Sequence, residues 1–166
     1  QSGRAVLGLN CHPLLLELEE RHELDRLLGG FVEILSDFAT QRDVAFVMID
    51  HDRRGSSADA ICLRPVHDEL VARLGAERLL YPDERLAAAE IKAVVAELDG
   101  VVSGRMHLMI AAMGAGTPVF GIDYKDKMEG LLTHFGLPTD TLCTAYEFIG
   151  RDSGLVTRLV GFVDRL

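Results

Sequence analysis

The sequence has few of the features that mark several large classes of protein. Its 166 residues contain no Trp, only 5 Pro and only 3 Cys. A low proline content together with 48% hydrophobic residues excludes a disordered chain and indicates one folded domain with a core. Basic residues number 17 against 26 acidic ones, so the chain lacks the basic surface that duplex nucleic acid usually requires. We therefore expect no nucleic-acid partner.

Cysteine usage and apolar run length also bear on where the protein works. Cys11, Cys62 and Cys143 are an odd count without a CxxC pair, which indicates reduced thiols rather than disulfides. No apolar run reaches the roughly 18 residues needed to span a bilayer, and we expect no signal peptide. We expect a cytoplasmic protein that makes at most peripheral contact with the inner face of the membrane.

What the sequence does contain is a regular alternation of short apolar segments and longer amphipathic ones. The pattern predicts strands over residues 5–10, 43–50, 77–82, 100–104, 117–123 and 140–144. It predicts helices over 24–38, 56–74, 86–98, 106–113, 127–135 and 153–166, with Ser57 as the N-cap of the second and Pro65 kinking or dividing it. Strands each followed by a helix are typical of the α/β class. We predict a single domain over 1–166, a doubly wound, Rossmann-like parallel sheet of about six strands with helices on both faces.

Polar residues follow the predicted strands, and in such a sheet ligands bind outside the carboxyl ends of the strands. The stretch "SGRMH" (103–107) places Arg105 and His107 between two apolar runs. On an ordinary surface helix Ser103 would cap a solvated first turn. Here the apolar flanks favour a central helix, whose N-terminus together with the guanidinium would bind a carboxylate or phosphate. His107 would then serve as a general acid or base, or as a neutral donor.

Other strand ends supply weaker candidates. Tyr124, Lys125 and Lys127 follow the fifth strand, where a second cation would meet the same anion. Asn10, His12, His51 and Asp52 offer polar contacts to a ligand, although we favour a structural role for His12. No HxH, HExxH or CxxC spacing supports a metal site. The GxSxG and GxxxxGK[ST] motifs of serine hydrolases and P-loop NTPases are missing as well.

Residues 101–137, "VVSGRMHLMIAAMGAGTPVFGIDYKDKMEGLLTHFGL", resemble the polysaccharide pyruvyl transferase family. The shared pattern is a strand, then S-x-R-x-H, a small-residue helix, G-x-P-V and a strand ending in Y-x-x-K. These positions are Ser103, Arg105, His107, Gly116, Pro118, Val119, Tyr124 and Lys127. The first hundred residues resemble the family mainly in order and spacing: a strand ending in Asn10, another ending in His51-Asp52, and Asp59 opening the next helix.

The resemblance implies transfer of the pyruvyl group of phosphoenolpyruvate to two hydroxyls of a cell-surface glycan sugar, which forms a cyclic ketal without a further cofactor. It implies that Arg105 holds the phosphoenolpyruvate anion and that His107 is the acid or base. It also implies a lipid-linked or nucleotide-linked sugar acceptor, as in bacterial exopolysaccharide or cell-wall synthesis. The residues that would complete the substrate site are Ser103, Gly104, Lys127, Tyr124, Asn10, His51, Asp52 and Gly116.

The family is also expected to have the two-domain GT-B architecture, whose domains hold about 150–200 residues each. The chain fits one such domain and begins with Gln1 rather than Met. We therefore expect a C-terminal half that turns over little without its N-terminal half. Two alternatives remain. The chain could be half of a nucleotide-sugar-dependent glycosyltransferase or epimerase, with Glu129 or Glu147 gripping a ribose, or it could be a non-catalytic Rossmann-like binding module.

Overall fold

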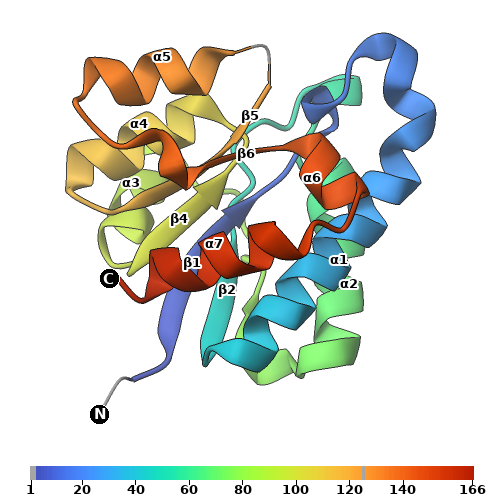
Figure 1. Cartoon of the computed structure of the whole chain (residues 1–166), viewed down its shortest axis with the longest axis horizontal. Helices are drawn as coiled ribbons and strands as arrows, with labels where there is room; N and C mark the ends of the chain where they lie inside the picture. Colours follow the sequence, from blue (N-terminus) through green and yellow to red (C-terminus); the bar gives the residue numbers. More distant parts are fainter. Residues whose placement is uncertain (1–2, 125) are drawn as a thin grey trace.

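A single parallel sheet forms the centre of the molecule (Figure 1). The computed structural model of the chain describes residues 3–124 and 126–166, apart from the side chain of Leu18. In this part of the chain six strands pair in the order β3-β2-β1-β4-β5-β6, and every pair is parallel. The predicted doubly wound sheet is thus confirmed. The strands are β1 (Ala5–Asn10), β2 (Val44–Met48), β3 (Leu79–Leu80), β4 (Gly100–Ser103), β5 (Val119–Asp123) and β6 (Leu142–Thr144).

Helices cover both faces of this sheet, because its apolar strands need a partner on each side. One core joins the sheet to helices α1, α2, α6 and α7, and the other joins it to α3, α4 and α5. Figure 1 shows α3, α4 and α5 together on one side of the strands, with α1 and α2 on the other. The helices are α1 (Leu24–Gln41), α2 (Ala60–Leu74), α3 (Ala88–Ala96), α4 (Met106–Ala115), α5 (Lys127–His134), α6 (Ala145–Ile149) and α7 (Ser153–Val163).

Some predicted boundaries were wrong. Helix α2 begins at Ala60, and Ser57 lies in a preceding 3-10 turn where its hydroxyl donates to the Arg54 carbonyl. Asp59, not Ser57, occupies the N-cap position. Pro65 lies inside α2 but does not divide it, since one helix runs from Ala60 to Leu74. The short helix α6 was not predicted, although the Thr144–Glu147 capping box at its start is a recognisable signal.

The sheet order fixes where polar strand ends meet. The chain winds outward from β1 to one edge of the sheet and then returns to β4, so β1 and β4 are neighbours at the switch point. Their register pairs Asn10, the last residue of β1, with Ser103, the last residue of β4. Crevices at such switch points are the usual ligand sites of open parallel sheets. The first and fourth strands therefore deliver their polar ends to the same place.

Candidate functional site

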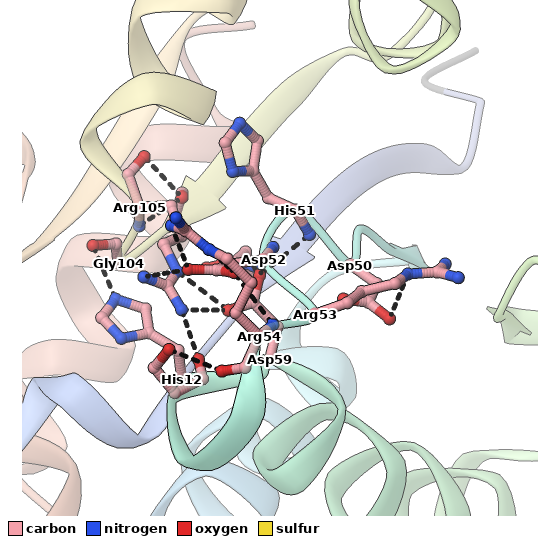
Figure 2. A network of polar contacts seen from close by, with 12 residues as sticks. His12, Asp50, His51, Asp52, Arg53, Arg54, Asp59, Gly104 and Arg105 are labelled. Carbon is pink, nitrogen blue, oxygen red and sulfur yellow. Dashed lines mark hydrogen bonds and ion pairs between the residues drawn. The ribbon is translucent and has the colours of Figure 1, made fainter. Parts of the chain in front are cut away.

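The carboxylate of Asp59 is the centre of a buried polar network at the switch point (Figure 2). Its Oδ2 accepts hydrogen bonds from Asn10 Nδ2 at 2.8 Å and from the backbone N–H groups of His51 at 2.9 Å and Asp52 at 3.0 Å. Its Oδ1 accepts from Arg105 Nε at 2.8 Å and Nη2 at 2.6 Å. Asp59 is fully buried. One side chain thus joins the ends of β1 and β4 to the loop that follows β2.

Arg105 is held by the protein itself. Besides the two bonds to Asp59, its Nη2 donates to the Ser57 carbonyl at 2.6 Å, and the side chain is only 11% exposed. Its Nη1 lies 3.6 Å from Asp52 Oδ2 and makes no hydrogen bond to the described residues. The sequence predicted that this guanidinium awaits a bound anion, but a buried guanidinium needs a carboxylate partner, and Asp59 supplies it. Only the Nη1 edge remains for a ligand.

Asp52 completes the charge balance of the network. Arg54 donates to its carboxylate from Nε and Nη2, both at 3.0 Å, and from the backbone N–H at 3.1 Å. These hydrogen bonds hold the pKa of Asp52 well below its usual range, so the group is ionised at neutral pH. Two carboxylates, Asp52 and Asp59, therefore face two guanidiniums, Arg54 and Arg105. The network, which we define as these four residues with Asn10 and Ser57, carries no net charge.

Ser103 and Gly104 build the turn into α4. The Ser103 hydroxyl accepts a hydrogen bond from the Arg105 N–H at 2.9 Å, and Arg105 is the N-cap residue. Gly104 is buried, and a Cβ there would lie 2.7 Å from Leu15 Cδ2 and 3.0 Å from His12 Nε2. Both residues were predicted to bind substrate, but their contacts are with the protein. The glycine is required because the His12 ring approaches the backbone closely.

His12 lies beneath this turn, fully buried. Its Nε2 donates to the Gly104 carbonyl at 2.9 Å, which leaves Nδ1 as an acceptor with no partner among the described residues. Burial lowers the pKa of His12 to about 4, so the ring is neutral at physiological pH. The rings of His12 and Tyr124 form a T-shaped pair with centroids 5.3 Å apart. These contacts agree with the structural role that we favoured for His12.

His51 and His107 form the exposed part of the site. Their rings are nearly parallel, 5° apart in orientation, with centroids separated by 6.2 Å. Both residues are exposed, and His107 lies on the first turn of α4. Partial burial, with the nearby positive charge of Arg105, lowers the pKa of His51 and keeps its ring neutral at neutral pH. This imidazole pair can accept protons from a ligand at the edge of the sheet and can donate protons to it.

The remaining predicted site residues divide into two groups. Tyr124 touches His12, and its ring lies 5.9 Å from the Nζ of exposed Lys127, so both belong to the same edge of the sheet. Lys125 lies outside the described residues. Gly116 does not belong to this group: it ends α4 in the left-handed conformation (φ +80°), just before β5. It therefore lies at the opposite, amino edge of the strands, and the structure separates it from the site.

From the sequence we expected Asp59 only to open a helix, and we did not predict its role at the centre of the network. Its signal was an acidic residue near the start of the helix predicted over 56–74, since Asp is among the preferred N-cap residues. Of the alternative ribose-binding candidates, Glu147 is used by the fold: it accepts from the Thr144 N–H at 2.7 Å and pairs with Arg158. Within residues 3–124 and 126–166, no group of three or more His, Cys, Asp or Glu side chains is placed to hold a metal ion. No described helix is both long and apolar enough to cross a membrane.

Two solved structures have a similar fold. A "putative UDP-N-acetylglucosamine 2-epimerase" from Listeria monocytogenes aligns with 98% of this chain at a TM-score of 0.55 and 18% identity. The chain spans only 40% of that protein. The molybdenum cofactor carrier protein of Chlamydomonas reinhardtii aligns with 93% of this chain and 99% of its own length, at a TM-score of 0.53 and 10% identity. At such identities the likeness concerns the fold alone.

Sequence comparison is more specific. No curated protein matches the chain. A family model described as polysaccharide pyruvyl transferase, however, matches residues 20–126. That segment covers more than half of the chain and contains His51, Asp59, Arg105 and His107. The chain therefore belongs to the polysaccharide pyruvyl transferase family.

Proposed function

We propose that the chain is the C-terminal half of a GT-B pyruvyl transferase that uses phosphoenolpyruvate as donor and a glycan sugar as acceptor. The observation that carries the proposal is that His51, Arg105 and His107 all fall inside the family match and converge at the switch point of the sheet. Family membership supports the class of transferase. The convergence of Arg105 Nη1 with the imidazoles of His51 and His107 supports binding of an anionic substrate and transfer of protons to and from it.

In this proposal phosphoenolpyruvate binds against the exposed edge of the network. Because Asp59 already neutralises most of the Arg105 guanidinium, its Nη1 is the part available to the carboxylate or phosphate. Lys127, exposed as the first residue of α5, which follows β5, adds a second positive charge on the same edge of the sheet. The imidazole pair supplies polar groups that do not repel an anion. In this proposal the network fixes the position of Arg105, while Lys127 and the imidazole pair make the exposed contacts with phosphoenolpyruvate.

The reaction needs proton transfers that the imidazole pair can perform. One acceptor hydroxyl adds to C2 of phosphoenolpyruvate while its proton passes to a base and another proton is delivered to C3. A second hydroxyl then displaces phosphate from C2, giving the cyclic ketal and inorganic phosphate, which carries away the second hydroxyl proton. We assign proton delivery to His107 and uptake of the first hydroxyl proton to His51, whose lowered pKa keeps it unprotonated at neutral pH.

Binding of phosphoenolpyruvate to the His107→Ala variant tests the proposal. His107 is exposed, so its loss should leave the fold intact, and we expect at least tenfold weaker binding by isothermal titration calorimetry. His22→Ala is the matched control, because His22 is also exposed (71%) but lies outside the site. Equal affinity of His107→Ala and wild type would contradict the proposal. Binding of UDP without phosphoenolpyruvate would favour a nucleotide-sugar enzyme. Binding of neither would favour a non-catalytic module or a site that only the N-terminal half completes, and repeating the titration with a chain that includes that half separates these two outcomes.

Turnover provides a second test. A GT-B site lies between two domains, so we propose that the chain alone releases little phosphate from phosphoenolpyruvate. Addition of the N-terminal half, or use of a chain that includes it, should restore phosphate release in the presence of a glycan acceptor. Full ketal formation by the 166-residue chain alone would contradict the half-enzyme proposal.

A further inference from the structure

A separate cavity of about 450 Å³ opens beside the imidazole pair. It lies beyond the carboxyl ends of β2 and β3, next to the start of α3. Its polar wall comes from the two segments that follow these strands, and its apolar wall from the first turn of α3. The residues that matter to its chemistry are Asp50, His51, Arg53, Arg85, Leu86 and Ile91. We call it the arginine cavity.

The positive charge of this cavity is not fully matched by the protein. Arg85 is exposed and makes no ion pair within the described part of the chain. Arg53 pairs with Asp50 through Nε at 3.0 Å and is 36% exposed, so its outer nitrogens remain available. At the N-terminus of α3 the Ala87 N–H is already bonded to the Glu90 carboxylate at 2.6 Å. Two guanidiniums against one carboxylate favour a ligand that carries negative charge.

Asp50 gives the cavity a second kind of contact. Its side chain is only 7% exposed, and its Oδ1 has no hydrogen-bond partner among the described residues. A buried carboxyl oxygen without a donor is unfavourable, and it is stabilised when a hydroxyl or amide hydrogen completes the bond. Burial also raises the pKa of Asp50, as expected for an incompletely paired carboxyl. A ligand with hydroxyl groups beside a phosphate would satisfy both Asp50 and the arginines.

The position of the cavity connects it to the site already described. His51 lines the cavity and at the same time stacks on His107. Figure 2 shows Asp50 and Arg53 on one side of the polar network and Gly104 and Arg105 on the other. A ligand in the arginine cavity would therefore reach the imidazole pair through His51, and Arg105 is not among the residues that line this cavity. Two substrates could meet at the imidazoles without competing for the same cation.

We propose that the arginine cavity binds the acceptor: a sugar joined to a diphosphate, with the diphosphate on Arg53 and Arg85 and the sugar hydroxyls near Asp50 and His51. This assignment rests on the proposed function, because it treats the Arg105 side as the donor site. The same sugar diphosphate chemistry occurs in lipid-linked and nucleotide-linked sugars.

The test is titration of the chain with three probes, followed by ¹⁵N–¹H NMR. The probes are inorganic pyrophosphate for the shared chemistry, UDP-N-acetylglucosamine for a nucleotide link, and farnesyl-diphosphate-linked N-acetylglucosamine for a lipid link. We expect at least one sugar diphosphate to bind more tightly than pyrophosphate and to shift the amides of His51 and Ile91. The tighter of the two sugar probes identifies the source.

Substitutions of Arg53 and Arg85 test whether these two side chains bind the sugar diphosphate. Arg85→Glu, which breaks no ion pair of the described residues, should weaken the tighter probe at least tenfold, and Arg53→Ala should do the same. Arg26→Ala on α1, across the sheet, is the control and should bind as wild type. Phosphoenolpyruvate affinity should be unchanged in Arg85→Glu. Failure of all three probes to bind, wild-type affinity in Arg85→Glu, or shifts remote from the cavity would overturn the assignment.

The two proposals fail in different ways. If sugar diphosphates bind through Arg85 while phosphoenolpyruvate does not bind, the cavity assignment as a sugar diphosphate site stands and the donor assignment falls. If phosphoenolpyruvate binds through His107 while no diphosphate binds, the donor assignment stands and the cavity assignment is wrong.

Discussion

The Asp59 network and the arginine cavity are neighbours built from the same kinds of residue, yet their charges are arranged in opposite ways. In the network each guanidinium has its own carboxylate: Arg105, 11% exposed, pairs with Asp59, and Arg54, which is 89% exposed, pairs with Asp52. In the cavity Arg85 is exposed and has no ion pair among the described residues, while Arg53 pairs with Asp50 but is itself 36% exposed. The paired charges of the network stabilise the folded arrangement of the strand ends. The arrangement in the cavity leaves charge available to a ligand.

This difference changes how an arginine at a strand end is interpreted. Arg105 has the position and chemistry of an anion-binding residue, but the protein supplies the anion. Arg85 lies in an unremarkable loop before a helix, yet it retains free charge. Whether the fold provides an internal carboxylate therefore decides which arginine is open to a substrate. The predictions below alter the two regions separately, beginning with the change of largest expected effect.

Asp59→Ala should be the most destabilising substitution in the network. It would leave Arg105 buried without its carboxylate and remove the acceptor of three further hydrogen bonds. Breaking a buried pair of this kind costs about 3–5 kcal/mol of unfolding free energy. Urea denaturation measures it. Asp140→Ala, which removes an exposed pair with Arg165, is the control and should cost about 1 kcal/mol or less. Similar losses in both variants would mean that the network is not a structural centre.

Stability should fall in acid because of His12. The folded state holds the pKa of His12 at about 4, below the value of 6.5 expected when unfolded. Protonation therefore favours unfolding: the stabilisation is complete above pH 6.5 and is lost as the pH falls toward 4. The loss attributable to this group is about 3 kcal/mol. Denaturation of wild type and His12→Gln between pH 4 and 7 should give a shallower pH dependence for the variant. Parallel curves would show that His12 does not titrate in this range.

Gly104→Ala should have an intermediate effect. The added methyl group would meet Leu15 and the His12 ring, and such overpacking costs about 1–3 kcal/mol. Gly114→Ala is the control, because a Cβ there has no neighbour within 4 Å and lies in helix α4, where alanine is favoured. Thermal unfolding should therefore separate the two variants in opposite directions. Equal melting temperatures would show that the turn tolerates a side chain.

His107→Ala should have the smallest effect on stability, within about 0.5 kcal/mol, because the side chain is exposed. The same variant should bind phosphoenolpyruvate at least tenfold more weakly than wild type. A large loss of stability would mean that the imidazole pair belongs to the buried network rather than to the exposed ligand side. Chemical denaturation and calorimetric titration of one preparation would measure both properties together.

Much of the fold was predictable from sequence, because buried strands and amphipathic helices have different periods. The strand ends carrying Asn10, His51 and Arg105 were also predictable, since parallel strands end at one edge. The pairing of Arg105 with Asp59 was not, because it joins residues 46 positions apart whose approach depends on the sheet order. Gly116 was wrongly predicted to belong to the substrate site for the opposite reason. It is close to Arg105 in sequence, but the ten residues of α4 carry the chain about 15 Å back along the sheet.

The adjacency of β1 and β4 also has a consequence for how the protein folds. The contact between His12 and the Gly104 carbonyl closes a separation of 92 residues, and β2, β3 and the helices around them lie in between along the chain. Contacts of such long range form slowly, because the entropy of closing the intervening chain is lost before the contact stabilises anything. The switch point should therefore assemble late. A fluorescent probe near Gly104 would report the last step of refolding, whereas a probe on the β1–α1–β2 unit would report an earlier one.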